Sequence, residues 1–272
     1  MSLKGKRVAL LEARMSGELS SLVERQGGIA YSVPAVRETA IDQPEEAAAF
    51  LDHLCAGRFD AVVFMTGVGA SALLKEAGKR NQLDAALRAL RTTVTVCRGP
   101  KPVAVLRRND IQVSVSAAEP HTTREVLDAT AALGVSGKRV GLVDYGERTV
   151  PAADGLRRQG AKVDEVCLYE WRLPEDPAPL EHLIGEIVDG KVDAVAVTSQ
   201  IQIRHLFQIA DNIGRHAALA DALNRRTVVA AVGPVCATAL RSFGVIPHVQ
   251  PAHPKMGPML LALADYFELT DR

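Results

Sequence analysis

The sequence is poor in aromatic residues, and its cysteines and histidines form no metal-binding pattern. Aromatic side chains make up 4% of the 272 residues, and there is a single tryptophan. The cysteines lack CxxC or Cys/His ligand spacing, and no histidine belongs to an HxH or HExxH motif. We therefore expect no metal. Cys55, Cys97, Cys167 and Cys236 are expected to be reduced, and most of them to act as small buried apolar residues.

Long apolar runs and an excess of charge are also missing. No run reaches the roughly 18 residues that indicate a transmembrane helix, and the start, MSLKGKRVALL, lacks the pattern of a signal peptide. We expect a cytoplasmic protein that does not bind membranes. Basic and acidic residues balance at 32 each, with no long basic run, which disfavours nucleic acid as a partner. Without a GxGxxG or Walker motif, we expect no nucleotide cofactor.

The length and composition suit two folded domains. A chain of 272 residues can form two domains of about 130 residues, each large enough to bury a core. Hydrophobic residues make up 47% and charged residues 24%, which is typical of a soluble globular protein rather than a disordered chain.

Four short phrases occur twice, in the same order. They are GKRV at 5 and 137, RQG at 25 and 158, DAV at 60 and 193, and GP at 99 and 233. The two occurrences are always 132 to 134 residues apart. Order and spacing of this kind indicate an internal duplication, so we expect two similar units.

Each copy alternates apolar runs of strand length with segments of helical spacing. The strand-like runs include RVALLEA (7–13), IAYSVPAV (29–36), FDAVVFMTG (59–67) and TVTVC (93–97). Nearly continuous apolar strands favour a parallel sheet that is covered on both faces. We predict an α/β fold with two similar doubly wound parallel-sheet lobes, of the flavodoxin or Rossmann type.

Doubly wound sheets bind ligands beyond the carboxyl ends of their strands, so the turns after the strands are the predicted site. These turns are Glu12–Gly17, Thr66–Gly69, Arg98–Lys101, Asp144–Arg148, Thr198–Gln202 and Gly233–Val235. They are rich in Gly, Thr, Ser and Pro, and would present backbone N–H groups and helix N-termini, which suit anions. We therefore expect an anionic ligand in a cleft between the lobes.

Several segments resemble the uroporphyrinogen-III synthase family. FDAVVFMTGVGASALL (59–74), VDAVAVTSQIQIRHLF (192–207) and TVVAAVGPVCATALRSFGV (227–245) resemble its strand–turn–helix segments. Residues 137–171, which end in VCLYEW, resemble its central segment with a Val-x-x-Tyr strand. The resemblance extends from Lys6 to Phe267. It implies a discontinuous lobe of residues 1–35 and 172–272 and a second lobe of residues 36–171. A two-stranded linker near residues 32–39 and 167–174 would join them.

The resemblance also implies an activity and a set of site residues. Such a lyase closes linear hydroxymethylbilane to uroporphyrinogen III, with inversion of the last pyrrole ring and loss of water, in tetrapyrrole (heme) biosynthesis. Family members need no cofactor, and we expect a monomer. Tyr169 matches the family's tyrosine and is the candidate catalytic residue. The substrate has eight carboxylates, which suits basic side chains and N–H donors. The candidate substrate-binding residues are Arg14, Thr66, Gly67, Arg98, Gly99, Lys101, Arg148, Thr198, Ser199, Gly233, Pro234 and Lys255.

Some family positions are not kept. Leu11-Glu12-Ala13 replaces the usual Thr-Arg-Pro, Asp144-Tyr145-Gly146 replaces an Arg-Gly turn, and Pro102 and Cys236 replace threonine. These departures leave a second hypothesis open, a synthase-like regulatory or partner-binding protein with little or no activity. A third, a two-lobed receptor for a small anion, is disfavoured by the missing signal peptide.

The candidate residues also have purely structural interpretations. Tyr169 could bury its ring in a strand and expose its hydroxyl. The hydroxyl residues Thr66, Thr198 and Ser199 could be helix N-caps. The basic residues could be solvated surface charges. His121, which precedes a predicted Thr-capped helix, is a further candidate contact.

Overall fold

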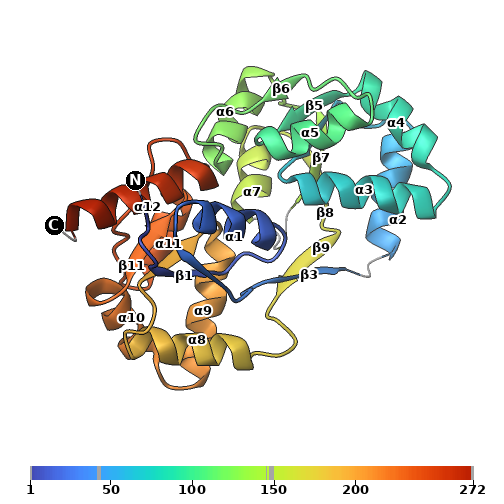
Figure 1. The fold of residues 1–272 in the computed structure, drawn as a ribbon. Helices are drawn as coiled ribbons and strands as arrows, with labels where there is room; N and C mark the ends of the chain where they lie inside the picture. The colour runs from blue at the N-terminus through green and yellow to red at the C-terminus, as the bar shows by residue number, and fades with distance from the viewer. Residues whose placement is uncertain (1, 42–43, 145, 147–149, 271–272) are drawn as a thin grey trace. The chain divides into compact units, whose positions relative to one another are not determined.

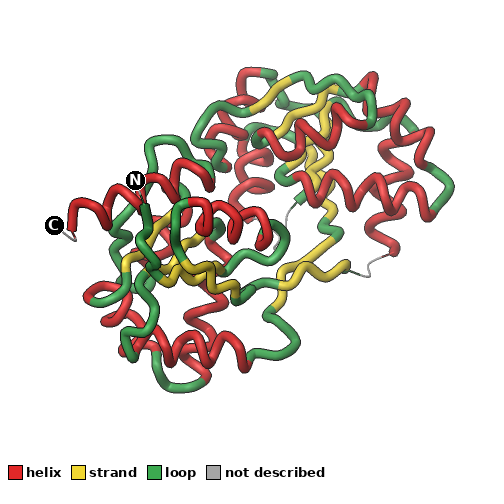
Figure 2. Tube along the Cα trace, in the orientation of Figure 1, coloured by secondary structure: helices red, strands yellow, loops and turns green. Residues whose placement is uncertain are grey.

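The chain divides into two compact units, each with its own parallel sheet (Figure 1). The computed structural model describes residues 2–41, 44–144, 146 and 150–270. Unit 1 consists of Met1–Arg37 and Arg172–Arg272, and unit 2 of Glu38–Trp171. In both units helices surround the strands (Figure 2). The predicted α/β class with doubly wound parallel sheets is confirmed.

The sheet of unit 1 is buried on both faces. In spatial order its strands are β11 (Val228–Ala231), β10 (Ala194–Val197), β1 (Arg7–Leu10) and β2 (Ile29–Ser32), and all neighbours are parallel. Successive side chains of a strand point to opposite faces. Ala9 and Leu11 accordingly belong to one hydrophobic core and Val8 and Leu10 to the other, and none is exposed. Burial on both faces explains why the strands are apolar at every position.

Helices form the two outer layers of unit 1. One face is covered by α8 (Ala178–Val188), α9 (Gln200–Asn212), α10 (His216–Arg225) and α11 (Pro234–Ser242). The other is covered by α1 (Ser16–Arg25) and α12 (Met256–Thr270). In the first layer the buried ring of Phe207 stacks on Phe243 with 4.5 Å between centroids. Both layers therefore rest on large apolar contacts with the sheet.

Unit 2 repeats this architecture. Its parallel strands, in spatial order, are β6 (Val115–Ser116), β5 (Val94–Cys97), β4 (Ala61–Phe64), β7 (Arg139–Val143) and β8 (Lys162–Val166). One face is covered by α2 (Pro44–Cys55), α3 (Gly67–Lys79), α4 (Leu83–Thr92) and α5 (Pro100–Arg108). The other is covered by α6 (Thr123–Ala132) and α7 (Val150–Arg158).

Each sheet is assembled from both copies of the duplication. In unit 1, β1 of the first copy pairs with β10 of the second, and in unit 2, β7 of the second copy pairs with β4 of the first. Two of the repeated phrases meet at these junctions. Asp193 Oδ2 accepts the N–H of Arg7, and Asp60 Oδ2 accepts the N–H of Arg139, both at 2.8 Å. The DAV phrase of each copy is thus hydrogen-bonded to the GKRV phrase of the other copy.

The chain passes between the units within two paired strands, β3 (Arg37–Ala40) and β9 (Tyr169–Arg172). The predicted strand over residues 29–36 is too long, because β2 ends at Ser32 and is followed by Pro34, which has no N–H for a sheet.

The predicted Val-x-x-Tyr strand is in fact two strands. β8 ends at Val166 and β9 begins at Tyr169. The hydrogen-bonding partner changes in between, since the carbonyl of Val166 accepts from Asp144 and that of Leu168 accepts from Ile41. The backbone therefore leaves the sheet of unit 2 and joins β3 within three residues.

The cysteines are all free, and three of the four are buried. Burial raises the pKa of the Cys97 and Cys236 thiols to about 12, so both stay protonated at neutral pH and are unreactive. Within the described part of the chain, no helix has both the length and the apolarity to cross a bilayer.

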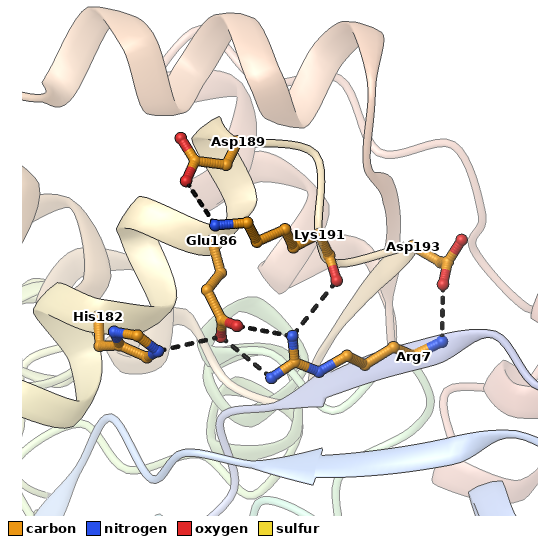
Figure 3. A network of polar contacts seen from close by, with 6 residues as sticks. All are labelled: Arg7, His182, Glu186, Asp189, Lys191 and Asp193. Carbon is orange, nitrogen blue, oxygen red and sulfur yellow. Dashed lines mark hydrogen bonds and ion pairs between the residues drawn. The ribbon is translucent and has the colours of Figure 1, made fainter.

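A bidentate ion pair attaches α8 to the amino end of β1 (Figure 3). The guanidinium of Arg7 donates to both carboxylate oxygens of Glu186, at 2.7 and 3.1 Å, and lies 3.9 Å from the ring centroid of Tyr31. The hydrogen bond from Arg7 holds the pKa of Glu186 below its usual value, against the effect of burial. Because Arg7 begins β1, this network lies away from the turns that follow the strands and stabilises the fold.

The substitution Glu186→Gln is expected to lower the free energy of unfolding at pH 7 by about 1–2 kcal/mol, because it keeps the shape and removes a charge-assisted pair. Since the folded-state pKa is depressed, the stabilisation is complete above the unfolded-state pKa of about 4.3 and is lost as pH falls through the folded value. Urea titrations at pH 7 and pH 3 would measure this. Glu181→Gln, an exposed change on the same helix, is the control. An equal deficit at both pH values would contradict the role of the ion pair.

Candidate functional site

In unit 2 the hydroxyls of Thr66 and Tyr169 meet beyond the carboxyl ends of the strands. The Thr66 hydroxyl lies 2.9 Å from that of Tyr169 and accepts the N–H of Gly69 at 3.0 Å, which caps α3. The side chain of Tyr169 is buried, and burial raises the pKa of its hydroxyl, although the bond to Thr66 opposes the rise. The hydroxyl therefore stays protonated at neutral pH, within hydrogen-bonding distance of Thr66.

The single tryptophan packs beside this tyrosine. The ring of Trp171 contacts that of Tyr169 edge-on, with 5.8 Å between centroids. Gly146, at φ +50°, lies against the same indole, and a Cβ at that position would be 2.5 Å from the ring. Gly146 therefore has to be glycine for Trp171, and through it Tyr169, to keep this position. Trp171 is not among the residues that the sequence patterns predicted for the site.

The other candidate residues of unit 2 lie in the adjacent turns. Arg98 directly follows β5, and its positive charge acts to lower the pKa of Tyr169. The N-termini of α3 and α5 approach closely, since a Cβ on Gly67 would lie 3.0 Å from the carbonyl oxygen of Lys101. A Cβ on Gly99 would lie 3.2 Å from the ring of His121. Thr66, Gly67, Arg98, Gly99 and Lys101 are thus brought together at one edge.

In unit 1 the corresponding edge contains an acidic network. Thr198 Oγ1 donates a hydrogen bond to Glu12 Oε2, and Gln202 Nε2 donates to the same oxygen at 3.3 Å. Gln202 Oε1 accepts the N–H groups of Thr198 and Ser199 at 2.9 and 3.2 Å. Ser199, rather than Thr198, is the N-cap of α9. The expectation that these N–H groups are open to an anion is therefore wrong for Thr198 and Ser199.

The remaining candidates of unit 1 have different surroundings. Arg14 and Lys255 are exposed, as the surface-charge interpretation expects, although the Arg14 N–H donates to Glu12 Oε1 at 3.3 Å. Gly233 is buried, and a Cβ there would lie 2.9 Å from Pro254, so the turn before α11 contacts the loop before α12. Pro234 begins α11 and is exposed.

The other positions that the sequence pointed to are either buried or outside the described residues. Arg148 lies outside the described residues. Pro102 and Cys236, which replace threonine, are buried in the first turns of α5 and α11. Asp144 is fully buried directly after β7. Gln202 ends a predicted turn but was not a candidate site residue, although the S-x-x-Q pattern of Ser199–Gln202 is a signal of a helix start that could have revealed it.

The site has no constellation for a metal in the part of the chain that the structure describes, where no group of three or more His, Cys, Asp or Glu could hold an ion. Its chemistry rests on a neutral phenol, a threonine hydroxyl, backbone N–H groups and basic side chains. Such groups can donate protons and hydrogen bonds to an anionic ligand.

Comparisons with known proteins agree on one family. A family model, uroporphyrinogen-III synthase HemD, matches residues 17–260. A putative uroporphyrinogen-III synthase from Methanothermobacter thermautotrophicus is 31% identical over 258 residues, or 92% of this chain and 93% of that protein. The uncharacterized protein YjjA from Bacillus subtilis is 33% identical over 266 residues, or 98% of this chain and 97% of that protein.

A solved structure is similar over the whole chain. The crystal structure of a mutant uroporphyrinogen III synthase from the extremely thermophilic bacterium Thermus thermophilus matches with a TM-score of 0.75 at 25% sequence identity. The match covers 97% of this chain and 100% of that chain. The similarity therefore includes both units described above.

Proposed function

Since the chain belongs to the uroporphyrinogen-III synthase family, we propose that it closes hydroxymethylbilane to uroporphyrinogen III, with inversion of the last pyrrole ring and loss of water. The observation that supports this activity most is the buried, protonated hydroxyl of Tyr169, held by Thr66 beyond the ends of the strands. The step belongs to tetrapyrrole biosynthesis.

The reaction needs a proton donor at one atom and control of geometry elsewhere. The Tyr169 hydroxyl donates to the departing hydroxyl of the substrate, which leaves as water and generates an azafulvene. The substituted carbon of the last ring then attacks the azafulvene carbon and forms a spiro intermediate. This intermediate rearranges to the inverted macrocycle. In the last step, the carbon of the inverted ring that closes the macrocycle releases a proton. This proton balances the one that the departing hydroxyl took up when it left as water. The remaining acceleration comes from folding the linear chain so that the correct carbon attacks.

Binding of the substrate carboxylates is assigned mainly to unit 2. Arg98 and Lys101 belong to the turn at the N-terminus of α5, beside the N-terminus of α3 with Thr66 and its partner Tyr169. Backbone N–H groups at a helix start and basic side chains both favour a carboxylate. Arg14 and Lys255 of unit 1 and Arg148 remain candidate contacts by sequence position.

The test is the isomer composition of the product. Hydroxymethylbilane made enzymatically is supplied to the purified protein, and the uroporphyrins are separated after oxidation. An active synthase gives isomer III in excess of the spontaneous background, in which closure without inversion gives isomer I. A product no richer in isomer III than the protein-free control would refute the activity.

A synthase-like protein without activity is the second candidate, and the acidic network of unit 1 favours it. Glu12 takes the place of a basic residue in the family pattern and accepts bonds from Thr198 and Gln202. A carboxylate at this place opposes an anionic substrate. The same isomer assay separates the two functions, because an inactive relative leaves the background unchanged.

A further inference from the structure

The duplication allows the two strand-end edges to be compared position by position. β1 and β7 correspond at a separation of 132 residues, so Glu12 corresponds to Asp144. α9 and α3 correspond at 133 residues, so the caps Ser199 and Thr66 correspond. Gln202 of unit 1 then corresponds to Gly69 of unit 2.

The neighbours of these residues agree with the correspondence. In unit 1 the Gln202 side chain contacts Glu12. In unit 2 a Cβ on Gly69 would lie 3.0 Å from the carbonyl oxygen of Asp144. The same structural position therefore holds a long polar side chain in unit 1 and no side chain in unit 2.

In unit 1 the side chains of Gln202 and Glu12 accept hydrogen bonds from donors at the start of α9. Gln202, which is 2% exposed, accepts the N–H groups of Thr198 and Ser199 through Oε1 and donates to Glu12 through Nε2. The Thr198 hydroxyl also donates to Glu12. A carboxylate of the chain itself is thus held by two side-chain donors at the start of α9, where the helix dipole favours negative charge.

The matching donors of unit 2 are arranged differently. Gly69 has no side chain to occupy the start of α3, and its N–H bonds to the cap Thr66. The Thr66 hydroxyl in turn lies within hydrogen-bonding distance of Tyr169. The two copies of the turn therefore differ at one position of the helix start, which is Gln202 in unit 1 and a glycine in unit 2.

We propose that Glu12 is a specificity-determining residue, an internal carboxylate that occupies the start of α9 and weakens binding of carboxylate groups to unit 1. The inference rests on the proposed function, because it identifies the ligand as the anionic tetrapyrrole. It explains how this chain tolerates an acidic residue where its family pattern has a basic one.

The variant Glu12→Gln tests the proposal, because it removes the charge and keeps the shape and an acceptor for Thr198. The probe is uroporphyrin, a stable octacarboxylate, and its dissociation constant is measured by quenching of the single tryptophan. We expect a dissociation constant about three- to tenfold lower than that of the wild type. The difference should shrink in high salt, which screens the charge, and should be smaller for coproporphyrin, which has four carboxylates.

The matched control is Glu24→Gln, which makes the same change on an exposed residue near the other end of α1. It should leave the dissociation constant unchanged. An unchanged or higher dissociation constant in Glu12→Gln, with the fold intact by circular dichroism, would overturn the proposal. If Glu12→Gln fails to fold, Glu12→Ala removes the same charge with a smaller side chain and is expected to tighten binding in the same way. Unchanged binding in that variant overturns the proposal equally.

The result of this binding test does not depend on whether the proposed synthase activity is correct. Wild-type protein that yields no excess of isomer III refutes the synthase activity. Tighter binding of uroporphyrin by Glu12→Gln in the same preparation still supports the role of Glu12 at the edge of unit 1.

Discussion

Replacing Tyr169 with phenylalanine is expected to slow the formation of uroporphyrinogen III about a hundredfold, because a positioned general acid contributes about 10²- to 10⁴-fold. The ring stays, so its contact with Trp171 and its burial are kept. Only the hydroxyl that meets Thr66 is removed. Because burial raises the pKa of this hydroxyl above its ordinary value, which is about 10, its ionisation should cause no loss of rate between pH 7 and 10.

The measurement is the initial rate and isomer ratio at saturating hydroxymethylbilane. Tyr266→Phe is the matched control, since it removes a hydroxyl from α12 beside Phe267, whose ring faces Lys6 near the amino end of β1. Tyr266→Phe should retain the wild-type rate. If Tyr169→Phe retains it as well, the protein uses another proton donor, and Tyr169 has a structural role only.

Replacing Gly146 with alanine is expected to reduce the rate at least about tenfold and to lower the free energy of unfolding by about 1–3 kcal/mol. A Cβ would overlap the indole of Trp171, and the backbone at φ +50° already disfavours a side chain. The indole has to move, and the edge-on contact that positions Tyr169 changes with it.

Trp171 reports this change directly, because it is the only tryptophan of the chain. The emission spectrum of Gly146→Ala should differ from that of the wild type before any substrate is added. Gly78→Ala is the control, since this helical glycine of α3 has open space at its Cβ position, and alanine there should stabilise the helix by about 1 kcal/mol. An unchanged spectrum and rate in Gly146→Ala would show that the turn tolerates a side chain.

Much of the fold could be predicted from local patterns. The apolar runs of β1, β4 and β10 have strand length, and helical spacing follows each of them, which was enough for the α/β class. The errors occurred where two strands are separated by a few residues, at Ser32–Arg37 and at Val166–Tyr169. There the backbone changes the strand with which it forms hydrogen bonds, and no local pattern of apolar residues specifies the new partner.

The sequence predicted which turns contain the candidate residues, but not which residues they contact. The turns after the strands contain Thr66, Arg98 and Thr198 as expected, but their partners come from distant segments. The Thr66 hydroxyl meets Tyr169 across 103 residues of sequence, and that of Thr198 meets Glu12 across 186. A local pattern contains no information on such pairs, because the fold alone sets which strand ends are adjacent.

The sequence by itself determined that the chain is a duplication of an α/β unit and that its ligand-binding turns follow the strands. Neither the duplication nor the local patterns indicate which copy completes which sheet, and only the tertiary structure gives the strand pairs at the junctions. Asp193 bonds to Arg7 and Asp60 to Arg139, so both junctions join one copy to the other. Both copies contain the same DAV and GKRV phrases, and the local interactions of either pairing are therefore nearly equal. The choice depends on the long-range packing of each helix layer against its sheet, and on a chain that crosses between the units within β3 and β9.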